Sequence, residues 1–145
     1  MNRRLEWAGI APCELPDVVD DPITFERVIM NPGATWDYFP GHFDVDYARA
    51  QGQPTIYVNA MHLAGFVDRA ATQWAGPLGR VVRRSIALAG SVYAGDTMTA
   101  RRRITGKRRD GERRLVDLHI DVHNQRGDLC VPADVTLDVS KAVYS

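Results

Sequence analysis

Cysteine is scarce in this 145-residue chain, which contains only Cys13 and Cys130, far apart in the sequence. Two isolated cysteines in no CxxC arrangement exclude a disulfide framework and a cysteine-based zinc motif. Long apolar runs are absent as well: no stretch approaches the length of about 18 residues that a transmembrane helix needs. Residues 1–7 are too polar for a signal peptide. We therefore expect a cytoplasmic protein that does not enter a membrane.

An excess of one charge sign is also missing. The 18 basic residues balance the 18 acidic ones, so no overall field favours binding to nucleic acid or to a membrane surface. The charge is uneven in one place, because residues 101–114 hold eight Lys and Arg against Asp110 and Glu112. A solvated hairpin is the favoured interpretation of this stretch, although a ligand rich in phosphate would also suit it.

The length and the apolar pattern predict one domain over residues 1–145. Residues 1–20 have two prolines and little periodicity, so we expect an irregular N-terminal arm. Residues 23–30 are rich in β-branched and apolar side chains and are bounded by Pro22 and Asn31-Pro32-Gly33, which predicts a first strand. A long ordered loop over residues 31–56 follows, with a short helical piece near residues 46–51.

Residues 57–74 contain no proline and place apolar side chains at helical spacing. Two adjacent stripes make this helix apolar over most of its circumference, so it is expected to be largely buried before Gly76-Pro77 ends it. Alternating apolar and polar residues then predict an antiparallel meander of about four strands. A sheet wrapped around one long buried helix is an α+β arrangement.

The segment most informative about function is Asp37-Tyr38-Phe39-Pro40-Gly41-His42, in which an acid and an imidazole lie five residues apart. Pro40 restricts the backbone and Gly41 relaxes it, so a tight turn can bring both side chains to one side. Such a pair can perform general acid–base catalysis. An Asp and a His in a solvated loop are the alternative when the pair is considered alone.

Three segments, in this order and spacing, resemble one known family. They are Asp37-x-x-Pro40-x-His42-x-Asp44, residues 48–52 leading into the buried helix, and the turn Tyr93-Ala94-Gly95-Asp96-Thr97-Met98. Over residues 23–140 the chain resembles the hot-dog fold and, within it, the MaoC-like (R)-specific enoyl-CoA hydratases. Residues 57–59 and 74–77 further resemble the small hydratase subunits of actinobacterial steroid side-chain degradation.

The resemblance implies hydration of a 2-enoyl-CoA thioester to the 3-hydroxyacyl-CoA, or the reverse dehydration. Asp37 and His42 would share one water: Asp37 would bind and deprotonate it and His42 would protonate the α-carbon, or the two residues would share these roles. Free backbone N–H groups near Val58, Asn59 and Ala60 would stabilise the enolate oxygen at the start of the helix. The CoA thioester is the substrate, and neither a cofactor nor a metal is expected.

The chain departs from the family pattern at two places. Most members have Asn in place of Phe39 and His-Gly in place of Val58-Asn59. Asn59 would therefore either reshape the site or supply its side-chain amide as an extra donor.

The resemblance also implies how CoA and other subunits are bound. Arg80, Arg83, Arg84 and the basic residues of 101–114 are candidates for contacts with the CoA phosphates. A homodimer, or a heteromer with another hot-dog subunit, is expected, with the site often at the subunit boundary. Loop aromatic residues suggest a bulky acyl group, including a steroid, unless they simply pack on the helix: Trp36, Tyr38, Phe39 and Phe43.

Other interpretations stay open beside this one. His119, Asp121 and His123 share one strand face and could bind zinc, but a polar solvent face is favoured. A hot-dog acyl-CoA thioesterase would place a carboxylate on the helix, where this chain has only Asp68, near the far end. A non-catalytic acyl-CoA-binding partner is the third alternative. His62 is expected in the core or lining a pocket, and Asp44 is expected to cap a turn.

Overall fold

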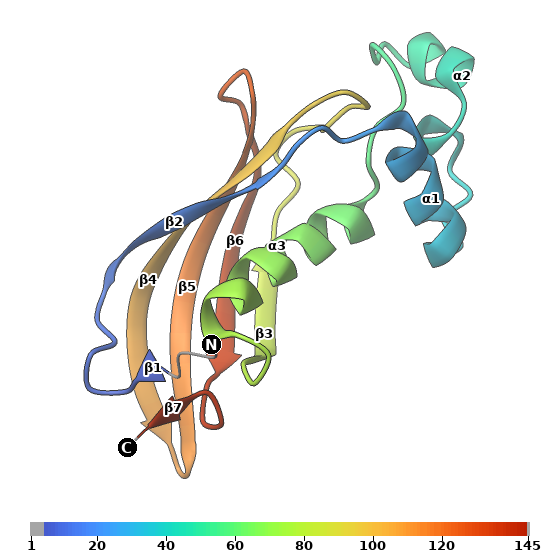
Figure 1. Cartoon of the computed structure of the whole chain (residues 1–145). Helices are drawn as coiled ribbons and strands as arrows, with labels where there is room; N and C mark the ends of the chain where they lie inside the picture. Colours follow the sequence, from blue (N-terminus) through green and yellow to red (C-terminus); the bar gives the residue numbers. More distant parts are fainter. Residues whose placement is uncertain (1–4, 145) are drawn as a thin grey trace.

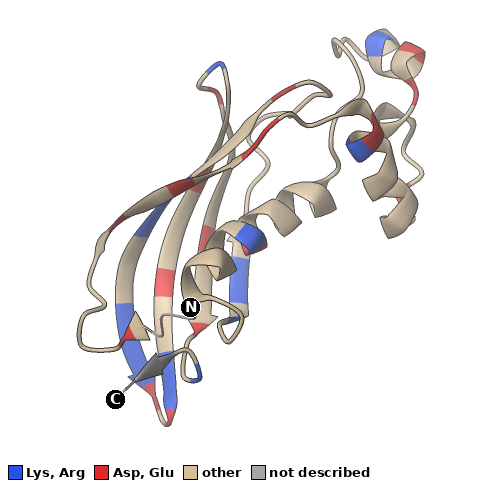
Figure 2. Ribbon diagram, viewed as in Figure 1, with Lys and Arg blue, Asp and Glu red and all other residues tan. Residues whose placement is uncertain are grey.

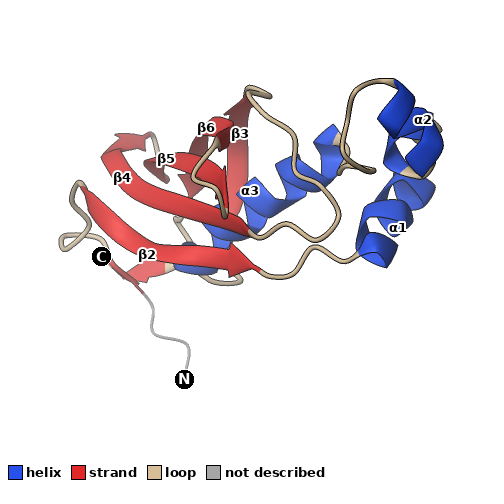
Figure 3. Ribbon diagram, turned by 90° about the horizontal axis from the view of Figure 1, so that it is seen from above, coloured by secondary structure: helices blue, strands red, loops and turns tan. Residues whose placement is uncertain are grey.

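A curved antiparallel sheet wraps around the long helix α3 (Ala60–Ala75) in the computed structural model, which describes residues 5–144 (Figures 1 and 3). Residues 1–4 of the expected N-terminal arm lie outside the described part. The strand order of the sheet is β2-β4-β5-β6-β3. The bounds are β2 (Cys13–Asp20), β3 (Arg80–Ile86), β4 (Met98–Asp110), β5 (Arg113–Asn124) and β6 (Leu129–Asp138). The predicted α+β hot-dog architecture is confirmed.

Helix α3 forms as the sequence predicts, with its start three residues later than expected. Residues 57 and 58 are extended instead, since Tyr57 bridges to Tyr93 and the Val58 N–H donates to the Val92 carbonyl at 2.9 Å. Asn59 is the N-cap, and its side-chain oxygen accepts from the His62 N–H. The stripe facing the sheet is buried: Leu63, Phe66, Val67, Ala70 and Ala71.

Strand β5 shows the alternation that the sequence predicts most clearly. Val116, Leu118, Ile120 and Val122 are all buried against the helix side, with at most 1% of each exposed. Strand β4 continues through Asp110 before a tight turn at Gly111, which has φ 58°. Residues 107–110 pair with residues 113–116 of β5, so the hairpin expected in the basic stretch is mostly strand and its turn is short.

The irregular N-terminal arm was a wrong prediction for residues 13–20. These residues form β2 and pair antiparallel with β4, from Cys13 opposite Ile104 to Asp20 opposite Met98. The register shifts between Leu15 and Val18, where Pro16 lies. Proline is tolerated at an edge strand and at a bulge, so its presence did not exclude a strand. A two-residue strand before it, β1 (Leu5–Glu6), pairs in parallel with β7 (Val143–Tyr144).

The first strand predicted over residues 23–30 was also wrong, because this segment begins helix α1 (Phe25–Thr35). Thr24 is its N-cap and accepts from the Arg27 N–H at 3.3 Å. Pro32 lies inside the helix, and only Val28 and Pro32 are buried. Phe25, Val28 and Ile29 follow helical spacing, but the segment before Pro32 is short and rich in β-branched residues, so the proline was mistaken for the end of a strand.

Two short helical elements connect α1 to α3. They are the 3₁₀ turn η1 (Pro40–His42) and helix α2 (Val45–Ala50), which confirms the short helical piece predicted near residues 46–51. None of the helices in the described range is long and apolar enough to cross a membrane.

Arg102 is a charged residue on the inner face of the sheet. Its side chain is buried and donates to the Pro16 carbonyl through Nε at 2.9 Å and to the Ala70 carbonyl through Nη1 at 2.7 Å. Burial lowers the pKa of the guanidinium below its usual value. Arg102 therefore ties the bulge of β2 to the middle of α3.

We predict that Arg102→Ala lowers the free energy of unfolding by about 2–4 kcal/mol, because charge-assisted hydrogen bonds to buried carbonyls are lost. Arg101→Ala is the matched control on the exposed outer face and should change the free energy by less than about 0.5 kcal/mol. Denaturant unfolding measures both. Equal effects of the two variants would contradict the role assigned to Arg102.

Candidate active site

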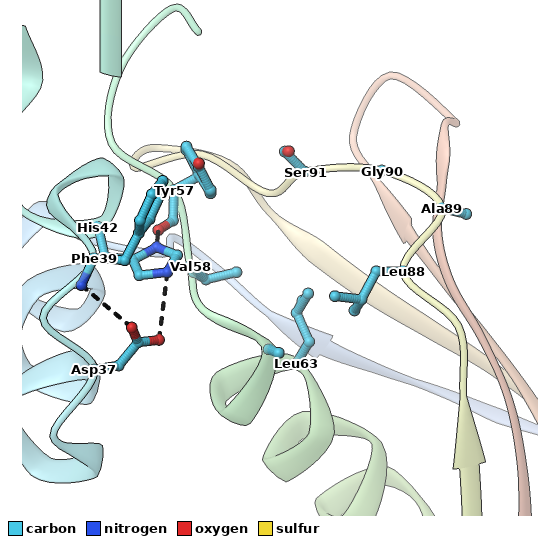
Figure 4. Close-up of a pocket in the computed structure, with 11 residues that line it drawn as sticks. Asp37, Phe39, His42, Tyr57, Val58, Leu63, Leu88, Ala89, Gly90 and Ser91 are labelled. Atoms are coloured by element: carbon cyan, nitrogen blue, oxygen red, sulfur yellow. Dashed lines mark hydrogen bonds and ion pairs between the residues drawn. The ribbon is translucent and has the colours of Figure 1, made fainter. Parts of the chain in front are cut away.

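Asp37 and His42 meet in the segment between α1 and α2 (Figure 4). Trp36 adopts the left-handed conformation (φ 57°) as the C-cap of α1, and the Asp37 N–H donates to the Pro32 carbonyl at 2.9 Å. The η1 turn then brings the chain back. As a result, Asp37 Oδ2 lies 3.5 Å from His42 Nε2. The structure thus brings together the acid and the imidazole singled out in the sequence.

The ring of His42 is held in one orientation. Its Nδ1 lies 2.7 Å from the carbonyl oxygen of Tyr57, and a carbonyl oxygen can only accept, so Nδ1 carries a hydrogen. The rings of Phe39 and Tyr57 pack edge-on against the imidazole, with centroids 5.4 and 5.1 Å away. The nitrogen that can exchange a proton is therefore Nε2, on the side of Asp37.

Asn59 contacts Asp37 from the start of α3. Its amide nitrogen donates to Asp37 Oδ2 at 3.1 Å and to Thr35 Oγ1 at 3.0 Å. The suggestion that this amide is an extra donor for a ligand was wrong, because both of its N–H groups are used within the protein. The sequence did not indicate Thr35 at all, since it lies 24 residues from Asn59.

The expected set of free N–H groups at the start of α3 also needs correction. The Val58 N–H is already bonded to Val92, as described above. Within residues 5–144, the N–H groups of Ala60 and Met61 have no acceptor, as the first turn of a helix requires. Both residues are exposed, and the positive end of the helix dipole lies here.

A pocket of about 480 Å³ brings Asp37 and His42 together with Ala60 at the start of α3. Its second wall is the segment that follows β3, which the sequence did not mark (Figure 4). The lining residues are Asp37, Phe39, His42, Tyr57, Val58, Ala60, Leu63, Leu88, Ala89, Gly90 and Ser91. The pocket therefore combines an acid–base pair, the N-terminal turn of a helix and apolar walls.

The turn at residues 93–96 supports this second wall. The buried carboxylate of Asp96 accepts from the Tyr93 N–H at 3.0 Å and from the side chains of Gln125 and Arg126. Burial alone would raise the pKa of Asp96, but these hydrogen bonds hold it below its usual value. A charged, fully bonded carboxylate thus fixes the loop beside the pocket.

The predicted phosphate contacts are not brought to this pocket by the chain itself. Arg80 forms an ion pair in which its Nη2 lies 3.6 Å from Asp138 Oδ2, and Arg84 forms one with Asp68 of α3. Arg83 lines a depression on the outer face of the sheet. Five of the basic residues of 101–114 lie at the β4–β5 hairpin, far from the start of α3 (Figure 2): Lys107, Arg108, Arg109, Arg113 and Arg114. Arg101, Arg102 and Arg103 lie nearer the start of β4, where Arg102 binds the Pro16 and Ala70 carbonyls. These arginines lie on strands that are distant from the pocket, and the charge composition of the sequence could not indicate this.

The remaining candidates from the sequence are the possible metal ligands on β5 and His62 of α3. His119 contacts Asp134 through Nδ1 and Asp121 through Nε2, at 2.8 and 3.1 Å. No group of three potential ligands is placed to hold a metal ion among residues 5–144. His62 does not line the pocket, and burial lowers the pKa of its imidazole.

Asp44 caps α2 by accepting from the Tyr47 N–H at 3.0 Å, which confirms the capping prediction. The loop aromatic residues divide into two groups. Phe39 packs on Tyr47 and His42, whereas Trp36 and Tyr38 are 78% and 68% exposed.

The family model of the MaoC like domain matches residues 13–125. The chain belongs to the MaoC-like family. A relative in this family, the 3-oxo-4,17-pregnadiene-20-carboxyl-CoA hydratase beta subunit of Mycobacterium tuberculosis, is 36% identical over 95 residues, which cover 66% of this chain and 70% of the relative. The resemblance to MaoC-like hydratases and to small subunits of steroid degradation is confirmed.

Solved structures agree with this assignment. A chain of the ChsH1-ChsH2 complex from Mycobacterium tuberculosis is 30% identical with a TM-score of 0.79, and the match covers 90% of this chain and 98% of that one. The (R)-hydratase from A. caviae is 22% identical with a TM-score of 0.75, covering 85% of this chain and 92% of that one. At this identity, the second likeness concerns the MaoC-like fold alone.

Gly41 makes room for the rings around His42. A Cβ at this position would lie 2.6 Å from Phe39 Cε1 and 2.8 Å from the Tyr57 hydroxyl oxygen. We predict that Gly41→Ala displaces one of these rings and costs about 1–3 kcal/mol of stability. Thermal unfolding measures this loss.

Gly33→Ala is the control, because a Cβ on Gly33 in α1 meets nothing within 4 Å. It should stabilise the protein by about 0.5–1 kcal/mol. A Gly41→Ala protein as stable as the wild type would contradict the tight packing of this turn.

Proposed function

We propose that this chain catalyses the hydration of a 2-enoyl-CoA thioester to the (R)-3-hydroxyacyl-CoA, or the reverse dehydration. The observation that carries the proposal is the 3.5 Å approach of Asp37 Oδ2 to His42 Nε2 in a pocket that also contains the first turn of α3. Family membership supports the reaction class.

Each group in the pocket has a role in this reaction. In hydration, Asp37 takes a proton from water as the water oxygen bonds to the β-carbon. The imidazolium of His42 gives its Nε2 proton to the α-carbon, which receives the electron pair of the double bond. The proton on Asp37 then returns to His42 Nε2 across the short gap between them, and the site is restored.

The negative charge that develops on the thioester oxygen needs donors. The unpaired N–H groups of Ala60 and Met61 and the helix dipole suit this task. Removing such a donor costs about 3 kcal/mol of transition-state stabilisation in other enzymes. Of the three residues proposed from the sequence, Asn59 and Ala60 have backbone N–H groups without an acceptor within residues 5–144, whereas the Val58 N–H is bonded to Val92.

A bulky apolar acyl group is part of the proposal. The pocket walls include Leu63 and Leu88, and exposed aromatic rings of Trp36 and Tyr38 flank Asp37 in the sequence. The relative from Mycobacterium tuberculosis is named for a pregnadiene carboxyl-CoA. The thioesterase alternative is disfavoured, because Asp68 is paired with Arg84 and does not line the pocket.

We predict that Asp37→Asn and His42→Ala each lower the hydration rate at least about 100-fold, the usual contribution of an acid–base group. The measurement is the loss of enoyl-thioester absorbance with crotonyl-CoA and with one polycyclic enoyl-CoA. Asp44→Asn is the matched control, since Asn caps a helix as well as Asp does and its rate should be unchanged. Undiminished hydration by both pair variants would refute the mechanism.

We further propose that the chain works as one subunit of a hot-dog pair, formed with a second copy or with a different hot-dog chain. Two observations support this: the similar chain of known structure belongs to a complex, and edge strand β3 pairs only with β6 within residues 5–144. Sedimentation equilibrium distinguishes the two forms. A mass near twice 16.2 kDa indicates a homodimer, and a monomer indicates a different partner. Full hydration activity from a stable monomer would contradict the proposal.

A further inference from the structure

We infer that Asn59 is the positioning residue for Asp37, and that it links the N-cap of α3 to the orientation of the catalytic carboxylate. This inference rests on the proposed function. It assigns Asn59 a role within the acid–base site, without contact between its amide and the substrate.

The orientation of the Asn59 amide is determined by its three partners. The His62 N–H lies 2.9 Å from one end of the amide, and a backbone N–H only donates, so that end is the oxygen. The nitrogen then faces Asp37 Oδ2 and Thr35 Oγ1, with one N–H for each. Only 1% of Asn59 is exposed, so no hydrogen of this amide is left for water or ligand.

Thr35 anchors the second N–H. Its hydroxyl donates to the Asn31 carbonyl at 2.9 Å, so its oxygen is left to accept from Asn59. The last turn of α1 and the first turn of α3 are therefore joined by side-chain hydrogen bonds. Asp37 follows Thr35 by two residues, so its backbone is held near the same amide that holds its side chain.

Asp37 has few other restraints. Its Oδ1 accepts from the Phe39 N–H at 3.3 Å, and its side chain is 35% exposed. Without the Asn59 N–H, Oδ2 keeps only the 3.5 Å contact with His42 and can rotate toward solvent. Catalytic groups misplaced by about 1 Å can lose about 100-fold in rate, so this restraint matters for proton transfer.

Asn59→Asp separates positioning from capping. Asp caps a helix as well as Asn does, so the oxygen for the His62 N–H remains. The variant has no N–H for Asp37 and places a second carboxylate beside it. We expect kcat for crotonyl-CoA hydration to fall about 10- to 100-fold while KM changes less than about threefold. Thr24→Asp, the same kind of cap change in α1, should leave kcat unchanged.

A stability measurement tests the contact independently of the reaction. Asn59→Asp should lower Tm by about 3 °C or more, because two carboxylates face each other. The double variant Asp37→Asn/Asn59→Asp exchanges the donor and the acceptor of this hydrogen bond. It should regain most of the Tm lost in Asn59→Asp while remaining inactive. This recovery is not expected if Asn59 only caps the helix.

The outcomes separate the two proposals. Asn59→Asp with kcat within twofold of the wild type, or no recovery of Tm in the double variant, overturns the positioning role. If the wild-type chain in its working assembly, as a homodimer or with its partner subunit, hydrates neither test thioester, the proposed function fails and the catalytic role of Asn59 fails with it. Recovery of Tm in that case still supports the contact between Asn59 and Asp37.

Discussion

Helix α3 is enclosed by the sheet along its apolar stripe, and this enclosure determines where chemistry can occur. The N–H groups inside the helix are bonded to its own carbonyls, so unpaired N–H groups occur only at its start, near Ala60 and Met61. The α1–α2 segment covers that end and brings Asp37 to it, and Asn59 connects the two. Loss of this helix end would therefore remove the donors, the support of the carboxylate and one wall of the pocket together.

The strongest sequence signals came from elements that bury one complete face. The alternation in β5 and the stripe of α3 are dictated by contact with the core, and both were predicted correctly. The segments that form β2 and α1 were misassigned, because each buries only a few residues and contains a proline. Whether such a segment forms a strand or a helix depends on the distant elements it contacts, which local pattern does not contain.

In the site, too, contacts within a short segment could be predicted and contacts between distant segments could not. Asp37 and His42 were recognisable because one short turn brings them together. Asn59 was noticed as a departure from the family pattern, but its contact with Asp37 spans 22 residues and could not be derived locally. The arginines were misplaced for a related reason. Arg102 is buried and binds backbone carbonyls, whereas Arg84 pairs with Asp68, so charge composition did not indicate ligand contacts.

The most direct test of the account is a crystal structure of the chain, in its working assembly, with a saturated acyl-CoA. The account predicts the thioester oxygen within about 3 Å of the N–H of Ala60 or Met61. It also predicts a water bound to both Asp37 and His42, next to the β-carbon. A thioester bound away from the start of α3, with Asp37 and His42 free of substrate and water, would contradict the central claim.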